Sequence, residues 1–103
     1  MDKSTFVEFE LKDQTVELTL NFYRLNQLKS KHKNEYKRYF ELTKGAGVQN
    51  DLEAVELIYV AYLCANMEKM PDVMSYEEFL QNMKNGRARI WAAVRDLNTD
   101  EKN

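Results

Sequence analysis

The N-terminal part of the chain alternates between hydrophobic and polar positions. Residues 6–11 place three hydrophobic side chains on one face and two glutamates on the other, and residues 16–20 repeat the pattern. Alternation with a period of two residues is typical of half-buried strands. A short polar segment separates the two runs and favours an antiparallel connection. The pattern therefore predicts a β-hairpin at about residues 6–20, whose apolar face must pack against the rest of the chain.

A helical period follows the hairpin directly. Seven side chains fall within one arc of a helix: Phe22, Leu25, Leu28, His32, Tyr36, Tyr39 and Phe40. Asn21 is suited to cap the start of this helix, and Gly45 is suited to end it in the left-handed conformation. Because the period is sustained, it predicts one long helix at about residues 22–43, with its weakest part at residues 30–34.

Three further helices are predicted, with the approximate bounds 50–69, 75–84 and 87–97. The first is uncharged between Glu56 and Glu68, so it should lie at the centre of the domain, covered on several sides. Capping-box patterns begin at Asn50 and Ser75, where a side-chain acceptor precedes a glutamate by three residues. Pro71 separates these two helices, and residues 98–103 are expected to fray.

The composition is that of an ordinary globular domain. The chain has 103 residues, of which 44% are hydrophobic and 31% are charged, with only three glycines and one proline. A chain of this length builds one core rather than two. We therefore expect a single domain over residues 1–103 in the α+β class, predominantly helical, with an N-terminal β-hairpin followed by about four helices.

The residues that usually carry catalysis are too few to form a site. His32 is the only histidine and Cys64 the only cysteine, and neither has partners at a spacing that would build a triad or bind a metal ion. Cys64 belongs to an apolar run of nine residues, which favours a buried structural thiol. His32 lies on the helical stripe and is expected to be partly covered. We expect no enzymatic activity, no metal and no cofactor.

The apolar segments of the sequence predict the location of the protein in the cell. The N-terminus shows no apolar signal-peptide core. The apolar run at residues 57–65 is shorter than the ~20 residues that span a bilayer. These patterns predict a cytoplasmic protein without membrane contact.

A basic stretch at residues 29–38 is the one feature that favours nucleic acid. On a single helix, however, three of its lysines lie on one side, while Lys31 and Arg38 lie on the opposite side. A groove that follows phosphates would bring them together, and the net charge is only −2. A nucleic-acid partner is therefore disfavoured relative to a solvated helix surface, although binding through this basic helix stays an alternative.

Aromatic residues make up 12% of the chain and are favoured anchors at protein interfaces. The candidate partner-binding residues all follow Pro71: Tyr76, Phe79, Met83 and Trp91. Trp91 lies between Arg87 and Arg95 at four-residue spacing, which predicts a position off the core stripe with an arginine stacked on it. The same four side chains would also serve to close the domain's own core, so both interpretations stay open.

The order of elements resembles the tail assembly chaperones of long-tailed bacteriophages and prophages of Gram-positive bacteria. The similarity is carried by residues 6–11, by residues 16–25, by the apolar segment 52–63 and by the sequence Ser-Tyr-Glu-Glu-Phe-Leu at residues 75–80. Residues 29–38 are more basic than that family's pattern, and residues 87–97 extend beyond the similar part.

This resemblance implies a non-enzymatic protein that binds the tape-measure protein and recruits tail-tube subunits. Such a chaperone would act in the bacterial host cytoplasm, would be absent from the mature virion and would be capable of self-association. A small helical adaptor or regulatory protein is the alternative that the same pattern allows.

Overall fold

The computed structural model describes residues 6–84 and 86–99. Its elements follow in chain order: β1 (Val7–Glu10), β2 (Thr15–Leu18), α1 (Phe22–Lys31), α2 (Lys33–Thr43), α3 (Asp51–Ala65), the 3-10 helix η2 (Met67–Lys69), α4 (Tyr76–Gln81) and α5 (Arg87–Thr99). The predicted class is confirmed, since an N-terminal antiparallel hairpin precedes a predominantly helical chain. The described residues form five α-helices where the sequence predicted about four.

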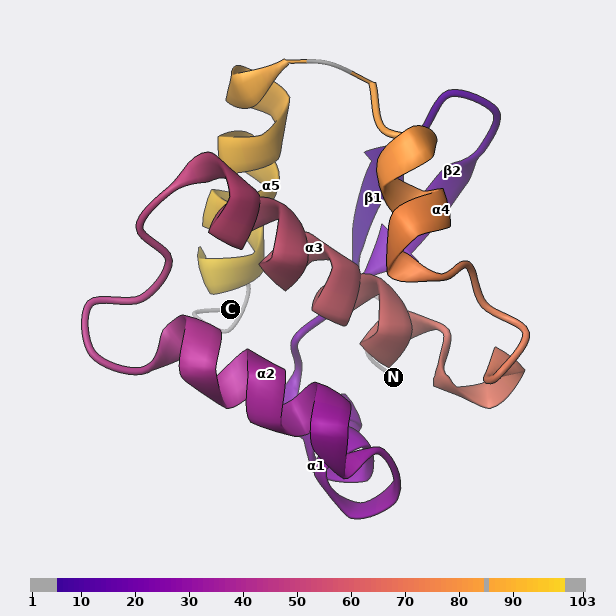
Figure 1. The fold of residues 1–103 in the computed structure, drawn as a ribbon, viewed down its shortest axis with the longest axis vertical. Helices are drawn as coiled ribbons and strands as arrows, with labels where there is room; N and C mark the ends of the chain where they lie inside the picture. Colours follow the sequence, from indigo (N-terminus) through magenta and orange to yellow (C-terminus); the bar gives the residue numbers. More distant parts are fainter. Residues whose placement is uncertain (1–5, 85, 100–103) are drawn as a thin grey trace.

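The helix α3 occupies the centre of the molecule (Figure 1). The helices α1 and α2 pack on one side of it, and the hairpin and α5 pack on the other. Ten of its fifteen residues are buried, which confirms the prediction that this helix, uncharged after Glu56, is covered on several sides. Its two sides belong to two hydrophobic clusters, which share Leu20, Tyr39 and Met70 as neighbours. The apolar interior is therefore continuous from α1 to α5.

The hairpin packs its apolar face on α3, as its alternating pattern predicted. Val7 lies opposite Leu18 and Phe9 lies opposite Val16, so the hydrophobic side chains of both strands share one face. Just after β2, the backbone N–H of Thr19 donates to the carbonyl of Ala61 at 3.1 Å. Ala61 is completely buried, and its small side chain suits this close approach of the hairpin backbone to the helix.

The prediction of a single helix at residues 22–43 is wrong, because the chain breaks at His32 into α1 and α2. His32 has φ −139° and ψ 71°, which is outside the helical region. Breaking at the weakest part of the helical period lets Leu25 and Leu28 pack on one part of the core and Leu42 on another.

Two aromatic residues of the predicted stripe are exposed. Phe22 is 79% exposed and Phe40 is 55% exposed. The break sets the phase of α2 separately from that of α1, so Leu42 rather than Phe40 is buried in α2. Phe22 is the first residue of α1 and is exposed although the same helix buries Leu25 and Leu28. His32 is partly covered, as predicted.

The other helices differ from their predicted bounds only at their ends. The helix predicted at 50–69 ends at Ala65 and is followed by η2, α4 is shorter than predicted, and α5 continues to Thr99. Asn50 and Ser75 cap α3 and α4, accepting from the backbone N–H of Glu53 and Glu78 at 2.9 Å and 3.1 Å. Of the tail predicted to fray, residues 100–103 lie outside the described residues. Within the described ranges, no helix combines the length and the apolar composition needed to cross a membrane.

Cys64 gives the first testable consequence of this core. Its side chain is completely buried between α3 and α1, and this burial raises the pKa of the thiol to about 12. Because the thiolate is the reactive form, we expect a thiol reagent at pH 8 to label Cys64 slowly in native buffer and rapidly in denaturant. A Cys64→Ala variant carrying Ser30→Cys on the exposed surface is the control and should react at once. Equal native and denatured rates for Cys64 would contradict the central position of α3.

Candidate protein-binding site

A hollow of about 220 Å³ opens between α2, α3 and α4. Its lining comes from all three helices: Asn34, Glu35 and Arg38 of α2, Glu56, Tyr59, Val60 and Leu63 of α3, and Tyr76 of α4. Val60 and Leu63 are almost completely buried, so they form an apolar floor. The rings of Tyr59 and Tyr76 stand beside this floor as partly exposed walls.

The aromatic wall is held in place from behind by hydrogen bonds to one loop residue. The hydroxyl of Tyr59 donates to the carbonyl of Met74 at 2.7 Å, and the N–H of Met74 donates to the hydroxyl of Tyr62 at 3.0 Å. The rings of Tyr59 and Tyr76 meet edge to face with their centroids 5.3 Å apart. Such pairs are favourable beyond the area that they bury. The wall is therefore formed before any ligand arrives.

A charged rim borders the same hollow. The guanidinium of Arg38 donates from Nε to Glu56 at 3.3 Å and makes a second, shorter contact with that carboxylate through Nη2. Its remaining nitrogen donates to Glu41 at 3.3 Å. The hydrogen bonds to Glu56 raise the pKa of Arg38 above its ordinary value. A guanidinium that binds one carboxylate through two nitrogens orients both side chains. The rim formed by Arg38 and Glu56 therefore has a fixed geometry.

The tyrosine hydroxyls of the hollow are poorly suited to proton transfer at neutral pH. Burial raises the pKa of Tyr59 above its ordinary value, and nearby Tyr62, Glu35 and Glu78 raise it further. Burial also raises the pKa of Tyr76, as does the carboxylate of Glu56. Both side chains therefore stay protonated and act as apolar walls with hydrogen-bonding tips.

The size of the hollow indicates what it could hold. Small-molecule pockets usually measure about 300–1,000 Å³, which is more than the 220 Å³ found here. A preformed apolar depression with a polar rim is instead typical of the pocket that receives one anchoring side chain of a partner protein. The arrangement is suited to binding a large apolar side chain that projects from another protein.

The structure separates Tyr76 from Phe79, although both were predicted to bind a partner. Tyr76 lines the hollow. Phe79 lies behind it and is completely buried, with ring centroids 5.4 Å from Tyr59, 5.1 Å from Tyr62 and 6.5 Å from Phe9. Phe79 thus closes the domain's own core and presents no surface to a partner.

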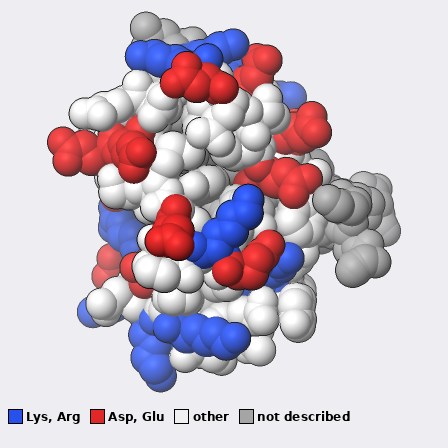
Figure 2. Space-filling view, turned by 90° about the vertical axis from the view of Figure 1, so that its right-hand side faces the viewer, with Lys and Arg blue, Asp and Glu red and all other residues white. Residues whose placement is uncertain are grey.

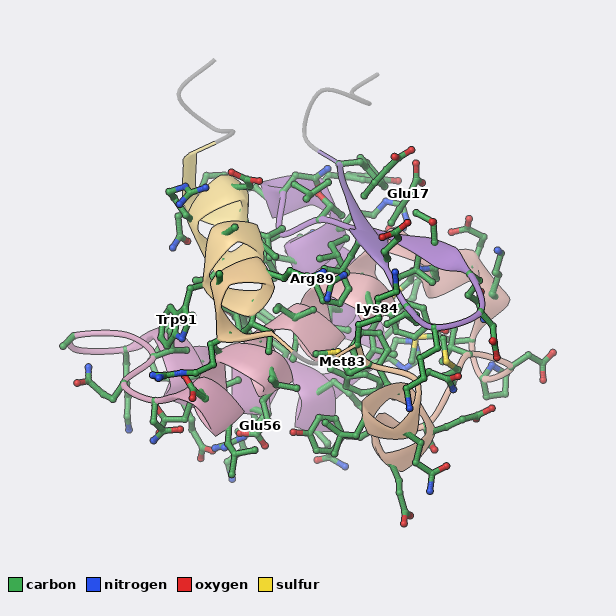
Figure 3. The ribbon with its side chains drawn as sticks, turned by 90° about the horizontal axis from the view of Figure 1, so that it is seen from above. Glu17, Glu56, Met83, Lys84, Arg89 and Trp91 are labelled. Atoms are coloured by element: carbon green, nitrogen blue, oxygen red, sulfur yellow. The ribbon has the colours of Figure 1, made fainter. Side chains whose placement is uncertain are left out.

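Met83 and Trp91 also lie away from the hollow and from each other. Met83 follows α4 and forms an isolated antiparallel bridge with Leu11, whereas Trp91 lies on the far side of α5 (Figure 3). The indole N–H of Trp91 donates to Asp51 at 2.8 Å, and Arg87 binds the same carboxylate at 2.8 Å rather than stacking on the ring. The hydrogen bond from Trp91 lowers the pKa of Asp51. The four predicted residues therefore do not form one surface.

Sequence reasoning missed Tyr59, Arg38 and Glu56 as parts of the hollow. Tyr59 was hidden within the uniformly apolar run of α3, and Arg38 was grouped with neighbouring lysines. One signal was available, because Glu56 is the last charged residue before eleven positions without charge, which end at Glu68. A carboxylate that borders an uncharged run of a buried helix indicates the side on which that helix meets a cation or solvent.

Two of the basic side chains at residues 29–38 contact other side chains of the described structure. Arg38 is engaged by two glutamates, and Lys29 lies over the ring of Tyr36 at 5.7 Å. Acidic and basic side chains are interspersed over the face shown in Figure 2, with basic ones at its lower end. Among the described residues, no cluster of three histidine, cysteine or acidic side chains could hold a metal ion.

Comparisons with known proteins do not assign this site. No protein-family model, no curated protein and no solved structure matches the chain.

Proposed function

We propose that this chain is a non-enzymatic protein-binding domain that acts as a tail assembly chaperone of long-tailed bacteriophages. The observation that carries the binding part of the proposal is the preformed apolar hollow beside Tyr59 and Tyr76. The tail-assembly part is supported by the resemblance of residues 6–25, 52–63 and 75–80 to that family. The partner would be the tape-measure protein, from which tail-tube subunits later displace the chaperone.

The chemistry of the hollow suits such a partner. A long helical protein exposes apolar side chains before the tail tube surrounds it, and one of these would enter between the tyrosine rings. A single small pocket gives modest affinity, so coverage would come from many copies bound along the partner. Modest affinity also permits release, because each copy must leave when tube subunits arrive.

Co-expression with the large helical protein encoded just downstream, where one exists, tests this function. Wild-type chain is expected to keep that protein soluble, and Tyr76→Ala is expected to reduce the soluble fraction severalfold because it removes one wall of the hollow. Tyr23→Ala is the matched control, since Tyr23 is 70% exposed on α1 and does not line the hollow. Circular dichroism should first show that both variants fold.

The possible outcomes separate the two parts of the proposal. If wild type neither binds nor solubilises the large protein, the chaperone function is wrong. If folded Trp91→Ala reduces the soluble fraction but Tyr76→Ala does not, the contact surface is α5 rather than the hollow. Salt-sensitive binding to DNA or RNA without binding to the protein would favour the basic stretch instead.

A further inference from the structure

We propose that the free edge of β1 binds an extended segment of a partner protein that carries lysine or arginine at every second position. This binding would add a strand to the hairpin. The surface lies between β1 and α5 and is separate from the hollow beside Tyr76. The inference therefore does not depend on the proposed role in tail assembly.

The backbone of β1 has an edge that the hairpin does not use. In the described residues, the sheet has two strands, so β1 pairs with β2 along one edge only. The carbonyl of Glu10 points to the other edge, where it accepts from Arg89 Nη2 at 2.6 Å. Backbone groups of a strand alternate in direction, so the N–H and carbonyl of Glu8 point the same way. An added strand would pair with these two groups of Glu8, because the carbonyl of Glu10 already accepts from Arg89.

The same edge already accepts backbone partners where the chain continues beyond β1. The N–H of Lys12 donates to the carbonyl of Asn82 at 2.8 Å, and Leu11 forms an antiparallel bridge with Met83. Within residues 6–84 and 86–99, no further strand pairs with this edge, although β1 extends back to Val7. A segment from another protein would continue the pairing along the unused part of the edge.

Space for such a segment exists between the hairpin and α5. A hollow of about 410 Å³ runs along the edge and is lined by Val7, Glu8, Phe9, Glu10, Thr15, Arg89, Ala92, Ala93 and Asp96. The two alanines leave room for a backbone to approach α5. Figure 3 shows Arg89 projecting from α5 into the region beneath the hairpin.

Arg89 offers a hydrogen-bond donor that the described chain does not use. Its guanidinium lies over the ring of Phe9 at 5.0 Å, and its Nη1 is buried without a hydrogen-bond partner among the described residues. Buried donors are nearly always paired in native proteins. Because Nη1 is buried, the Arg89 side chain would have to turn toward the added strand before a backbone carbonyl, which is a neutral acceptor, could pair with it.

The charge of this surface favours a basic segment. Glu8 and Glu10 project from the face of β1 that is turned away from the core. Glu10 already binds Lys84 at 3.1 Å, whereas Glu8 lies directly opposite Glu17 of β2. Like charges directly opposite one another destabilise a strand pair. Side chains of an added strand alternate between faces, so lysine or arginine at every second position would all lie on this acidic face. Apolar residues between them would contact the alanines of α5.

Short synthetic peptides of alternating lysine and valine, acetylated and amidated at their ends, test the proposal by fluorescence anisotropy and amide chemical shifts. The lysine peptide is expected to bind and to shift the amides of residues 7–10, whereas a glutamate–valine peptide should not bind. Two further peptides carry N-methyl groups on all lysines or on all valines. Only one set of N–H groups faces β1, so one methylated peptide should lose affinity about tenfold or more while the other keeps it.

A charge-reversed pair of variants completes the test. Glu8→Lys is expected to weaken lysine-peptide binding, and Glu77→Lys on exposed α4 should not, although both change the net charge equally. Tyr76→Ala should also bind normally, which keeps this surface distinct from the hollow. Equal affinity of both methylated peptides would show attraction by charge alone and would overturn the proposal. Absence of binding by the lysine peptide would overturn it as well.

Discussion

Replacing Phe79 with alanine is expected to lower the free energy of unfolding by about 3–5 kcal/mol, the usual cost of truncating a buried phenylalanine. The side chain is completely buried and contacts the rings of Phe9, Tyr59 and Tyr62. It therefore joins the hairpin, α3 and α4 at one point. Truncation would leave a cavity among rings that cannot easily move to fill it.

Leu80→Ala is the matched control for Phe79→Ala. Leu80 is the next residue of α4 but is 37% exposed, so its truncation should cost at most about 1 kcal/mol. Urea unfolding followed by circular dichroism measures both changes. A smaller loss for Phe79→Ala than for Leu80→Ala would mean that α4 packs on the domain with a different face.

Leu28→Ala is expected to lower the free energy of unfolding by about 2–5 kcal/mol. Leu28 is completely buried in the cluster that joins α1 to α3. Asn26→Ala, on the exposed side of the same helix, should change stability by no more than about 0.5 kcal/mol. A cost below about 1 kcal/mol for Leu28→Ala would contradict the docking of α1 on the central helix.

The elements that were predicted correctly are those whose signal is local. Alternation in residues 6–11 and 16–20 is a property of neighbouring positions, and a strand of period two is the simplest structure that satisfies it. The central position of α3 followed from the absence of charge after Glu56, because a helical segment that is apolar all round must be covered on several sides. Asn50 and Ser75 marked helix starts through hydrogen bonds only three residues long.

The break at His32 could not be predicted in the same way. The stripe from Phe22 to Phe40 satisfies a helical period whether or not the helix is interrupted, so periodicity does not decide between one helix and two. The decision depends on where Leu28 and Leu42 find buried neighbours. That is a property of the folded domain, and helix propensity is too weak a preference to override it.

The candidate site was predicted only in part. The rest could not be predicted for a reason similar to that for the break at His32. Tyr76 and Phe79 are three residues apart and share a face of α4, so the sequence treats them alike. Only the distance to α3 decides that Phe79 is buried while Tyr76 borders the hollow. Arg38 and Glu56 are eighteen residues apart, and no local pattern indicates that they bind each other across the rim.

Site-specific photo-crosslinking tests the proposed binding most directly. A p-benzoylphenylalanine residue at the position of Tyr76 would place its reactive carbonyl at the mouth of the hollow, and the same residue at the position of Tyr23 is the control. After co-expression with the large helical protein encoded downstream and irradiation, position 76 is expected to give a covalent adduct with that protein, and position 23 is not. No adduct from position 76, or equal adducts from both positions, would contradict binding through the hollow.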